Sequence, residues 1–293
     1  AVIASVLKWA EPWEFSWVFL ATFILAGALY LRGSRRLHVG TWRRVAFWIG
    51  MAIIYLSLQT YLDFYAEHEF LVHRTQQLFL HHLAPLLVVA SYPAVVLRAG
   101  LPLRWRLRWL RRVRQSWPWR TVTGVLLNPV VATLLFIGFI LIWLVPRMQE
   151  LAMLDWRIYR FMNWSMLVSG FAYWSLVLDH RPHPPGRMQA GMRVLSPGIT
   201  MAPQMLAGAI ITFSRSDLYP IFEICGRALT LNVITGQMIG GLIIWVPSAM
   251  LETLGAMLAL RQWLRLSRNG RLSRRMRPGM PMHGHAPGQL ASD

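Results

Sequence analysis

Apolar stretches long enough to cross a membrane recur along the whole chain, and short polar connections separate them. A helix needs about 20 mainly apolar residues to cross the hydrocarbon core of a bilayer. Seven stretches meet this requirement: Phe15–Leu31, Val45–Leu62, Leu78–Leu97, Val122–Val145, Ile158–Leu178, Val194–Phe213 and Leu229–Leu260. The pattern predicts an all-α polytopic membrane protein, built as a bundle of seven transmembrane helices.

The connections between these stretches alternate in charge, and the alternation predicts an orientation. The first, third and fifth connections, together with the segment after Leu260, hold 23 of the 30 basic residues. The second, fourth and sixth connections hold seven of the twelve acidic residues and few arginines, and are called the acidic connections below. Basic connections of membrane proteins stay in the cytoplasm. We therefore expect the N-terminus outside and the C-terminus in the cytoplasm.

Composition agrees with a membrane protein and changes how the charge is interpreted. The chain is 55% hydrophobic and 14% charged, whereas a soluble domain carries about 25% charged residues. A net charge of +18 would suggest nucleic acid in a soluble protein. Here the basic residues flank apolar stretches, so we expect anionic lipid on the cytoplasmic side and no nucleic acid. The start of the chain lacks the features of a signal peptide, and we expect it to belong to the mature protein.

Two regions differ in composition. Residues 1–262 contain all the apolar stretches and form the predicted transmembrane domain, whereas residues 263–293 are basic and rich in glycine and proline. Such a tail is predicted to be disordered and cytoplasmic. It contains Met280, Met282, His283 and His285, residue types that suit copper. The alternative is that this short segment has no metal role.

The richest candidate chemistry lies between Asp63 and Pro93, where four histidines occur at the start of an apolar run: His68, His73, His81 and His82. Ionisable groups at the mouth of a membrane helix are costly unless they have partners or a function. On a continuous helix His73 and His81 lie on one face, about 12 Å apart. They therefore cannot bind one metal ion together unless the helix breaks. Copper ligands and buried hydrogen-bonding groups both remain possible roles.

Methionines of later stretches are possible partners for these histidines. Met201 and Met205 lie one helical turn apart, and Met238 lies in the last stretch. Thioether and imidazole groups together favour Cu(I), although methionine is also ordinary packing in apolar helices. Glu252 lies deep in the last stretch, so we expect it to be paired, protonated or near the inner surface. The lone Cys225 excludes an internal disulfide and a metal cluster of cysteines only.

Four segments, in order along the chain, form a recognisable pattern. They are DFYAEHEFLVHRTQQLFLHHLAPLL from Asp63, YWSLVLDHRPHPPGRM from Tyr173, ITFSRSDLYPIFEICGRAL from Ile211 and TGQMIGGLIIWVP from Thr235. Together they resemble the polytopic CtaG family of cytochrome c oxidase assembly factors. The resemblance covers most of the chain from the second apolar stretch to the seventh.

The resemblance implies a multi-pass protein of the bacterial inner membrane that helps to mature a haem–copper oxidase. Its partners would be oxidase subunits, and its role would fall at copper acquisition; we expect it to hold or transfer copper at the outer face of the membrane. The implied metal residues are His68, His73, His81 and His82. This chain departs from the family pattern at Gln77, where members often have histidine, and at Gly236, where they often have an acidic residue.

Other functions remain open from the residues alone. A copper transporter or permease fits the prolines and polar groups inside the apolar stretches, although no inverted repeat is visible. A haem-binding membrane protein is a further alternative. The outer histidines come from one segment, which argues against two axial histidines but leaves histidine–methionine ligation open. No nucleophile–base pair or phosphate-binding loop occurs, so we predict no enzymatic activity.

Overall fold

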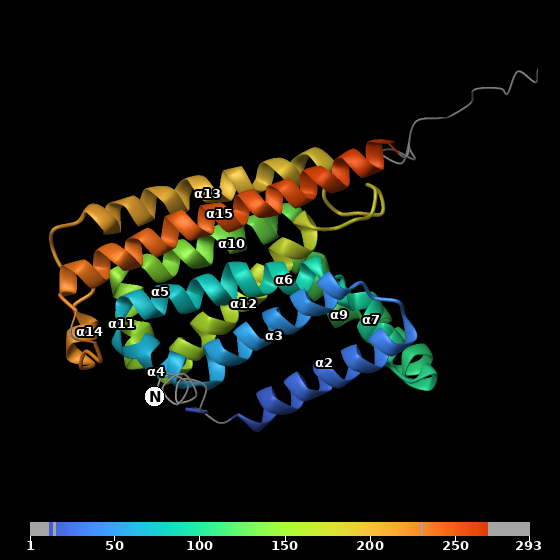
Figure 1. Cartoon of the computed structure of the whole chain (residues 1–293), viewed down its shortest axis with the longest axis horizontal. Coiled ribbons are helices and arrows are strands. Elements are labelled where there is room, and N and C mark those ends of the chain that lie inside the picture. The colour runs from blue at the N-terminus through green and yellow to red at the C-terminus, as the bar shows by residue number, and fades with distance from the viewer. Residues whose placement is uncertain (1–11, 14–15, 230, 269–293) are drawn as a thin grey trace, which may run out of the picture.

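The computed structural model describes residues 12–13, 16–229 and 231–268, and most of these residues are helical. The helices that form the bundle are α2 (Trp17–Arg36), α3 (Thr41–Gln59), α5 (Phe70–Leu78), α6 (Ala84–Ala90), α10 (Pro129–Leu144), α12 (Trp156–Val177), α13 (Ala190–Phe213) and α15 (Val233–Arg268). A π-helical turn, η1 (Phe79–Leu83), joins α5 to α6. These helices lie side by side along the long axis of the molecule (Figure 1).

Short helices cover the two ends of the bundle (Figure 1). One end carries α4 (Tyr61–His68), α11 (Pro146–Leu154) and α14 (Ile221–Ile224), which lie in the acidic connections; we call it the acidic end. The other carries α7 (Pro93–Gly100) and α9 (Trp117–Leu126); we call it the arginine-rich end. The π-helical turn η2 (Trp105–Trp109) and α8 (Leu110–Gln115) connect α7 to α9. The predicted alternation of acidic and basic connections therefore corresponds to two ends of the bundle.

The all-α class and the presence of membrane helices are confirmed. Among the described residues, α2, α13 and α15 are each long and apolar enough to cross a membrane. The number rises to as many as five if each of two bent helix pairs counts as one span. Helical segments also occupy the other predicted stretches, but the count of seven spans and the orientation stay predictions.

The third helix has different bounds from those predicted. It begins at Phe70 instead of Leu78 and continues through η1 to Ala90, where a 65° bend separates it from α7. The bend lies at Tyr92, which adopts a left-handed conformation with φ of 54° directly before Pro93. The first turns were missed because they are rich in polar residues, and hydropathy does not register polar side chains that other helices bury.

The fourth predicted stretch, Val122–Val145, is not one straight helix. Helices α9 and α10 meet at a 66° bend. The side chain of Asn128 accepts hydrogen bonds from the first amides of α10, and Pro129 occupies its first position. This pair is a standard helix start, because a proline at the first position has no amide that needs a partner. Apolar composition continues across the bend, so hydropathy alone did not reveal it.

The proline after the two adjacent histidines produces a π-helical turn instead of a break. Pro85 has no amide hydrogen for the carbonyl of His81, four residues earlier. Helix α12 approaches this carbonyl at Gly170, where a Cβ atom would lie 2.4 Å from the oxygen. The sequence thus combines Pro85 and Gly170 to bring α12 against the histidine pair. Turns of this kind are frequent at functional sites.

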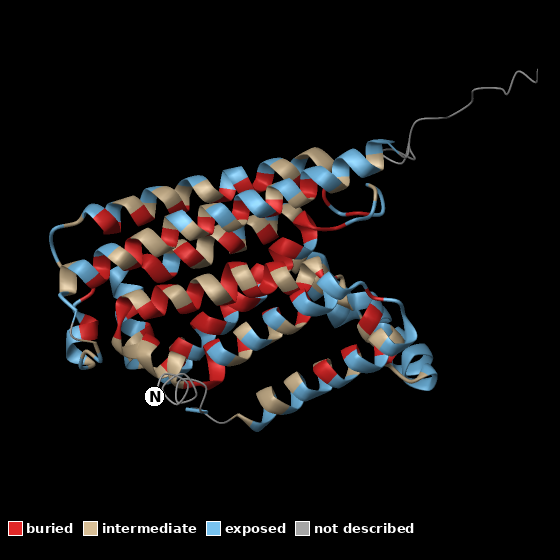
Figure 2. Cartoon of the chain, viewed as in Figure 1, coloured by how far each residue is buried: buried red, intermediate tan, exposed pale blue. Residues whose placement is uncertain are grey.

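Burial is concentrated inside the bundle, on α5, η1, α6 and α12, whereas α2, α13 and α15 expose one side (Figure 2). The exposed sides are apolar, with residues such as Ile24, Leu206 and Phe213. Exposed apolar sides are what a bilayer requires of a spanning helix. Helix α15 extends to Arg268, past the predicted start of the tail at residue 263. The tail candidates Met280, Met282, His283 and His285 lie outside the described residues.

Candidate functional site

Polar side chains fill the middle of the bundle, along α5 and η1. Arg74, Gln77, His81 and His82 are all buried there. His81 and His82 lie near the middle of the helix that runs from Phe70 to Ala90, and not at its mouth as the apolar pattern predicted. Charged or strongly polar groups at this depth are costly and need partners. The partners come from α10, α11, α13 and α15.

A hydrogen-bonded cluster in this interior centres on the pair of His82 and Glu252. His82 Nε2 lies 3.1 Å from Oε1 of Glu252. The same carboxylate accepts hydrogen bonds from Gln204 Nε2 at 2.6 Å and from Thr200 Oγ1 at 2.8 Å. Glu252 lies in the middle of α15 and is 1% exposed. Of the three alternatives for this residue, the structure therefore favours a paired carboxylate inside the bundle.

His81 contacts its neighbour through the other ring edge. The Nδ1 atoms of His81 and His82 are 3.3 Å apart, and the ring of His81 stacks on Phe136 with centroids 4.0 Å apart. If Nε2 of His82 donates its proton to Glu252, Nδ1 of His82 carries a lone pair that accepts from His81. Nε2 of His81 is buried without a hydrogen-bond partner. The pair therefore holds more lone pairs than the protein itself satisfies.

A second cluster lies nearer the acidic end and surrounds Arg74. Its guanidinium donates to Gln77 Oε1 at 2.5 Å, Gln149 Oε1 at 2.7 Å and the Trp143 carbonyl at 3.2 Å. Gln149 Nε2 lies 3.2 Å from Nε2 of His73. All these acceptors are neutral, so the cation is hydrogen-bonded but not ion-paired. Gln77, which departs from the family pattern, has a clear role here as an acceptor for Arg74.

Two acidic residues at the acidic end, Asp63 and Glu69, are buried. Asp63 accepts from Gln76 Nε2 at 2.5 Å and from the Tyr159 hydroxyl at 2.7 Å. Glu69 accepts from the Leu229 amide at 2.8 Å and is 1% exposed. These carboxylates therefore join α4, α5 and α12 at the acidic end, since each accepts hydrogen bonds from another part of the chain.

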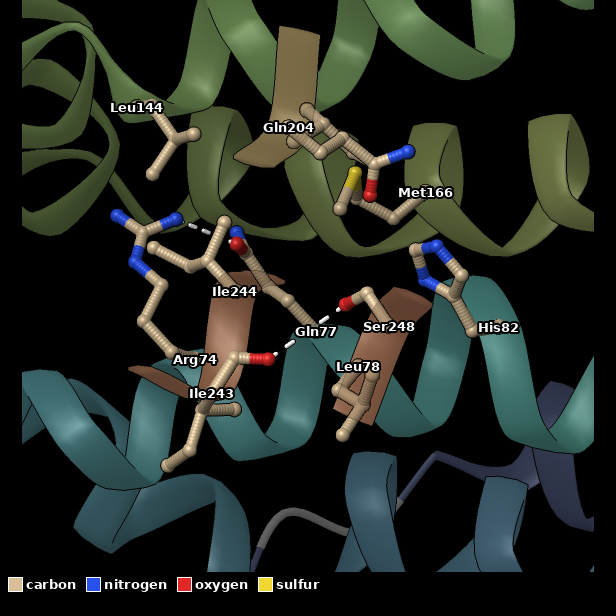
Figure 3. Close-up of a pocket in the computed structure, with 11 residues that line it drawn as sticks. Arg74, Gln77, Leu78, His82, Leu144, Met166, Gln204, Ile243, Ile244 and Ser248 are labelled. Carbon is tan, nitrogen blue, oxygen red and sulfur yellow. Dashed lines mark hydrogen bonds between the residues drawn. The ribbon is translucent and has the colours of Figure 1, made fainter. Parts of the chain in front are cut away.

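Between the two clusters lies a cavity of about 20 Å³. Its polar and sulfur-containing lining residues are Arg74, Gln77, His82, Met166, Gln204 and Ser248 (Figure 3). Three buried atoms of this lining have no hydrogen-bond partner: Arg74 Nε, Gln77 Nε2 and Gln204 Oε1. A cavity needs about 10–15 Å³ to hold one water molecule. The space therefore suits a single small polar guest with both donors and acceptors around it.

The predicted site residues do not gather at one point. His68 Nδ1 donates to the Phe64 carbonyl at 2.7 Å, and its ring packs at a tilt against the Phe64 ring. His73 belongs to the Arg74 cluster, and only His81 and His82 contact each other. Among the described residues, no group of three or more histidine, cysteine, aspartate or glutamate side chains could hold a metal ion. A copper role for these histidines stays a prediction.

The predicted methionine partners lie elsewhere. None of Met201, Met205 and Met238 lines the central cavity, and Met238 is 40% exposed. The methionine that does line it is Met166, on α12. Sequence reasoning missed Met166 because nothing in its local pattern separates it from packing residues. Gln204 and Gln149 were also missed, although a glutamine inside an apolar stretch is a usable signal.

These features define a helical membrane protein whose interior joins adjacent histidines to a carboxylate on a distant helix. A comparison with protein families found that the cytochrome c oxidase caa3 assembly factor family (Caa3_CtaG) matches residues 28–266. The chain belongs to this family, and the resemblance inferred from its four segments is confirmed. Comparisons with curated proteins and with solved structures found no match.

Proposed function

We propose that this protein is a non-enzymatic assembly factor of the bacterial inner membrane that holds Cu(I) for a haem–copper cytochrome c oxidase. Family membership supports the assembly role. The observation that supports copper is the buried pair of His81 and His82 with Glu252 behind it. Copper is the cargo here, received by this protein and passed to an oxidase subunit.

The chemistry of the pair suits a small soft cation. Metal-binding histidines usually donate their second ring N–H to a carboxylate, which fixes the tautomer; Glu252 is so placed relative to His82. Two nitrogens bound to a tetrahedral ion at about 2 Å lie roughly 3.3 Å apart. The two Nδ1 atoms are 3.3 Å apart. Met166 lines the adjacent cavity, and a thioether favours Cu(I) over harder cations.

The protein would cross the membrane seven times, with the acidic end outside and the arginine-rich end in the cytoplasm. The uneven distribution of arginines supports this orientation. Copper for an oxidase would then enter from the acidic end. His73, in the cluster around Arg74, lies on that side of the pair and is the next candidate ligand, with His68 beyond it. The histidine pair at mid-depth, and not the outer face, is the holding site.

The assembly role is tested by deleting the gene and measuring oxidase activity and copper content of isolated membranes. We expect both to fall together, and to recover with the wild-type gene but not with His81→Ala/His82→Ala. Unchanged activity and copper after deletion would contradict the assembly role. If the double variant restores both, the assembly role survives and the copper site is wrong.

A permease would move copper across the membrane instead of holding it. Uptake of Cu(I) into proteoliposomes that contain the purified protein separates the two functions. We expect binding without uptake above that of empty liposomes. Uptake of Cu(I) that depends on His81 and His82 would mean that the protein transports copper and does not hold it for an oxidase.

A further inference from the structure

A second and much larger cavity lies at the arginine-rich end, away from the histidine pair. Its volume is about 460 Å³, within the range of small-molecule sites, which is roughly 300–1,000 Å³. The polar residues that line it are His38, Arg43, Tyr92, His180, Gln262 and Arg265. They come from the segment that joins α2 to the first turn of α3, the bend before α7, the connection after α12 and the end of α15. Four separate parts of the chain thus meet around it.

The charge of this cavity has one sign. Arg43 and Arg265 are the charged lining residues, and no acidic residue lines it among those the structure describes. Arg43 lies over the ring of Tyr92, 5.0 Å from its centroid, and neither arginine side chain forms an ion pair or hydrogen bond with another described residue. The nearby carboxylate of Asp179 is bound to Arg181 at 2.7 Å. Both guanidinium groups therefore have free donors for an anion.

Tyr92 is held in place at considerable cost. A left-handed conformation is uncommon for a residue other than glycine, asparagine or aspartate, and such strain persists only where the surroundings impose it. The Tyr92 hydroxyl accepts a hydrogen bond from Gln262, and His180 packs edge-on against its ring, with centroids 4.9 Å apart. The ring therefore forms a fixed part of the cavity wall, which also includes apolar residues such as Val95 and Val96.

We propose that this cavity binds the phosphate group of an anionic phospholipid. Guanidinium groups bind phosphate through paired hydrogen bonds, and basic pockets between helices on the cytoplasmic side bind lipid head groups. A free phosphate ion would supply the same contacts. The lipid fits better because about 460 Å³ far exceeds one phosphate, and Leu37, Val95, Val96 and Leu266 supply apolar walls. This inference does not depend on a copper role.

The test is native mass spectrometry of the detergent-purified full chain with phosphatidylglycerol, and with phosphatidylcholine as the neutral lipid. Arg43→Gln/Arg265→Gln removes both cations of the cavity. Arg106→Gln/Arg108→Gln is the matched control, because it removes the same charge from exposed residues of η2 that do not line the cavity. We expect the cavity variant to weaken phosphatidylglycerol binding roughly 10- to 30-fold and the control to leave it within about twofold.

Three results would overturn the proposal. Equal losses in both double variants would mean attraction to surface charge and not to a site. Equal binding of phosphatidylcholine would exclude recognition of the anionic lipid. Binding of inorganic phosphate that displaces the lipid and is lost in the cavity variant would assign the site to the free ion. If the cavity variant does not fold, Val95→Trp, which fills the cavity without changing charge, is expected to reduce lipid binding in the same assay.

Discussion

The central cavity and the cavity at the arginine-rich end differ in the burial and hydrogen bonding of their polar side chains. The central one measures about 20 Å³, and its polar lining residues are buried and make hydrogen bonds within the protein, although three of their atoms have no partner. The one at the arginine-rich end measures about 460 Å³, and its two arginines are exposed and have no protein acceptor. An unpaired polar group is costly at mid-depth, so most polar groups there have a partner in the protein. Near the interface the same donors are free to bind something else.

Replacing Glu252 should give the largest loss of stability, because three buried donors meet at its carboxylate. Glu252→Ala leaves His82, Thr200 and Gln204 without their acceptor, and breaking a buried charged pair costs about 3–5 kcal/mol. Arg43→Gln, at the open cavity, should cost less than about 0.5 kcal/mol. Thermal unfolding of both variants in detergent measures the difference. Similar unfolding midpoints for the two variants would contradict the expected difference in stability between the cavities.

Replacing Arg74 tests the same difference between the two cavities with a buried cation. Arg74→Leu leaves the acceptors of Gln77, Gln149 and Trp143 unpaired in the interior, and each buried unpaired group costs about 1–3 kcal/mol. Arg265→Leu removes the same charge at the other cavity, where no protein acceptor is lost. We expect Arg74→Leu to lower the unfolding midpoint clearly and Arg265→Leu to leave it nearly unchanged. A larger effect for Arg265→Leu would show that the end cavity contributes more to stability than the interior.

Gly170 tests whether close packing of α12 supports the histidine pair. In Gly170→Ala the new Cβ would meet the His81 carbonyl oxygen at 2.4 Å, and overpacking of this kind costs about 1–3 kcal/mol. Gly198→Ala on α13 is the matched control, because nothing lies within 4 Å of its Cβ position. Alanine there should be neutral or stabilising, since it favours a helix by up to about 1 kcal/mol. Equal midpoints for the two variants would mean that α12 shifts freely.

The ion pair between Asp179 and the half-exposed Arg181 should have the smallest effect. Burial alone would raise the pKa of Asp179, but hydrogen bonds from Arg181 outweigh it and hold the pKa below its usual value. A lowered folded-state pKa stabilises above the unfolded pKa, and this stabilisation is lost as the pH falls through the folded pKa. Arg181 is more than half exposed, so Arg181→Gln should cost under about 1 kcal/mol at pH 7.

Unfolding measured over a series of pH values checks the role of the ion pair between Asp179 and Arg181. Unfolding midpoints of Arg181→Gln and the unchanged protein should differ slightly near neutral pH and converge in acid, once Asp179 is protonated. A difference that grows in acid would give the opposite sign and contradict the lowered pKa.

Hydropathy and charge were enough to predict a helical membrane protein and its two unlike ends, because bilayer thickness and topology act on whole segments. They failed where tertiary contacts decide. The polar start of α5 was excluded from the bundle because its partners lie on other helices. The acceptor of His82 is Glu252, 170 residues away, and no local spacing connects the two. Met166 was missed for the same reason.

Cu(I) binding by the purified full chain is the most direct test of the central claim. Protein is titrated against a chromogenic Cu(I) chelator, in its unchanged form and as His81→Ala/His82→Ala. His183→Ala, an exposed histidine at the arginine-rich end, and His283→Ala/His285→Ala, in the tail, are the controls. We expect one Cu(I) per chain that only the His81/His82 double variant loses. Absence of binding, or binding that survives loss of the pair and disappears with the tail histidines, would contradict a copper site in the middle of the bundle.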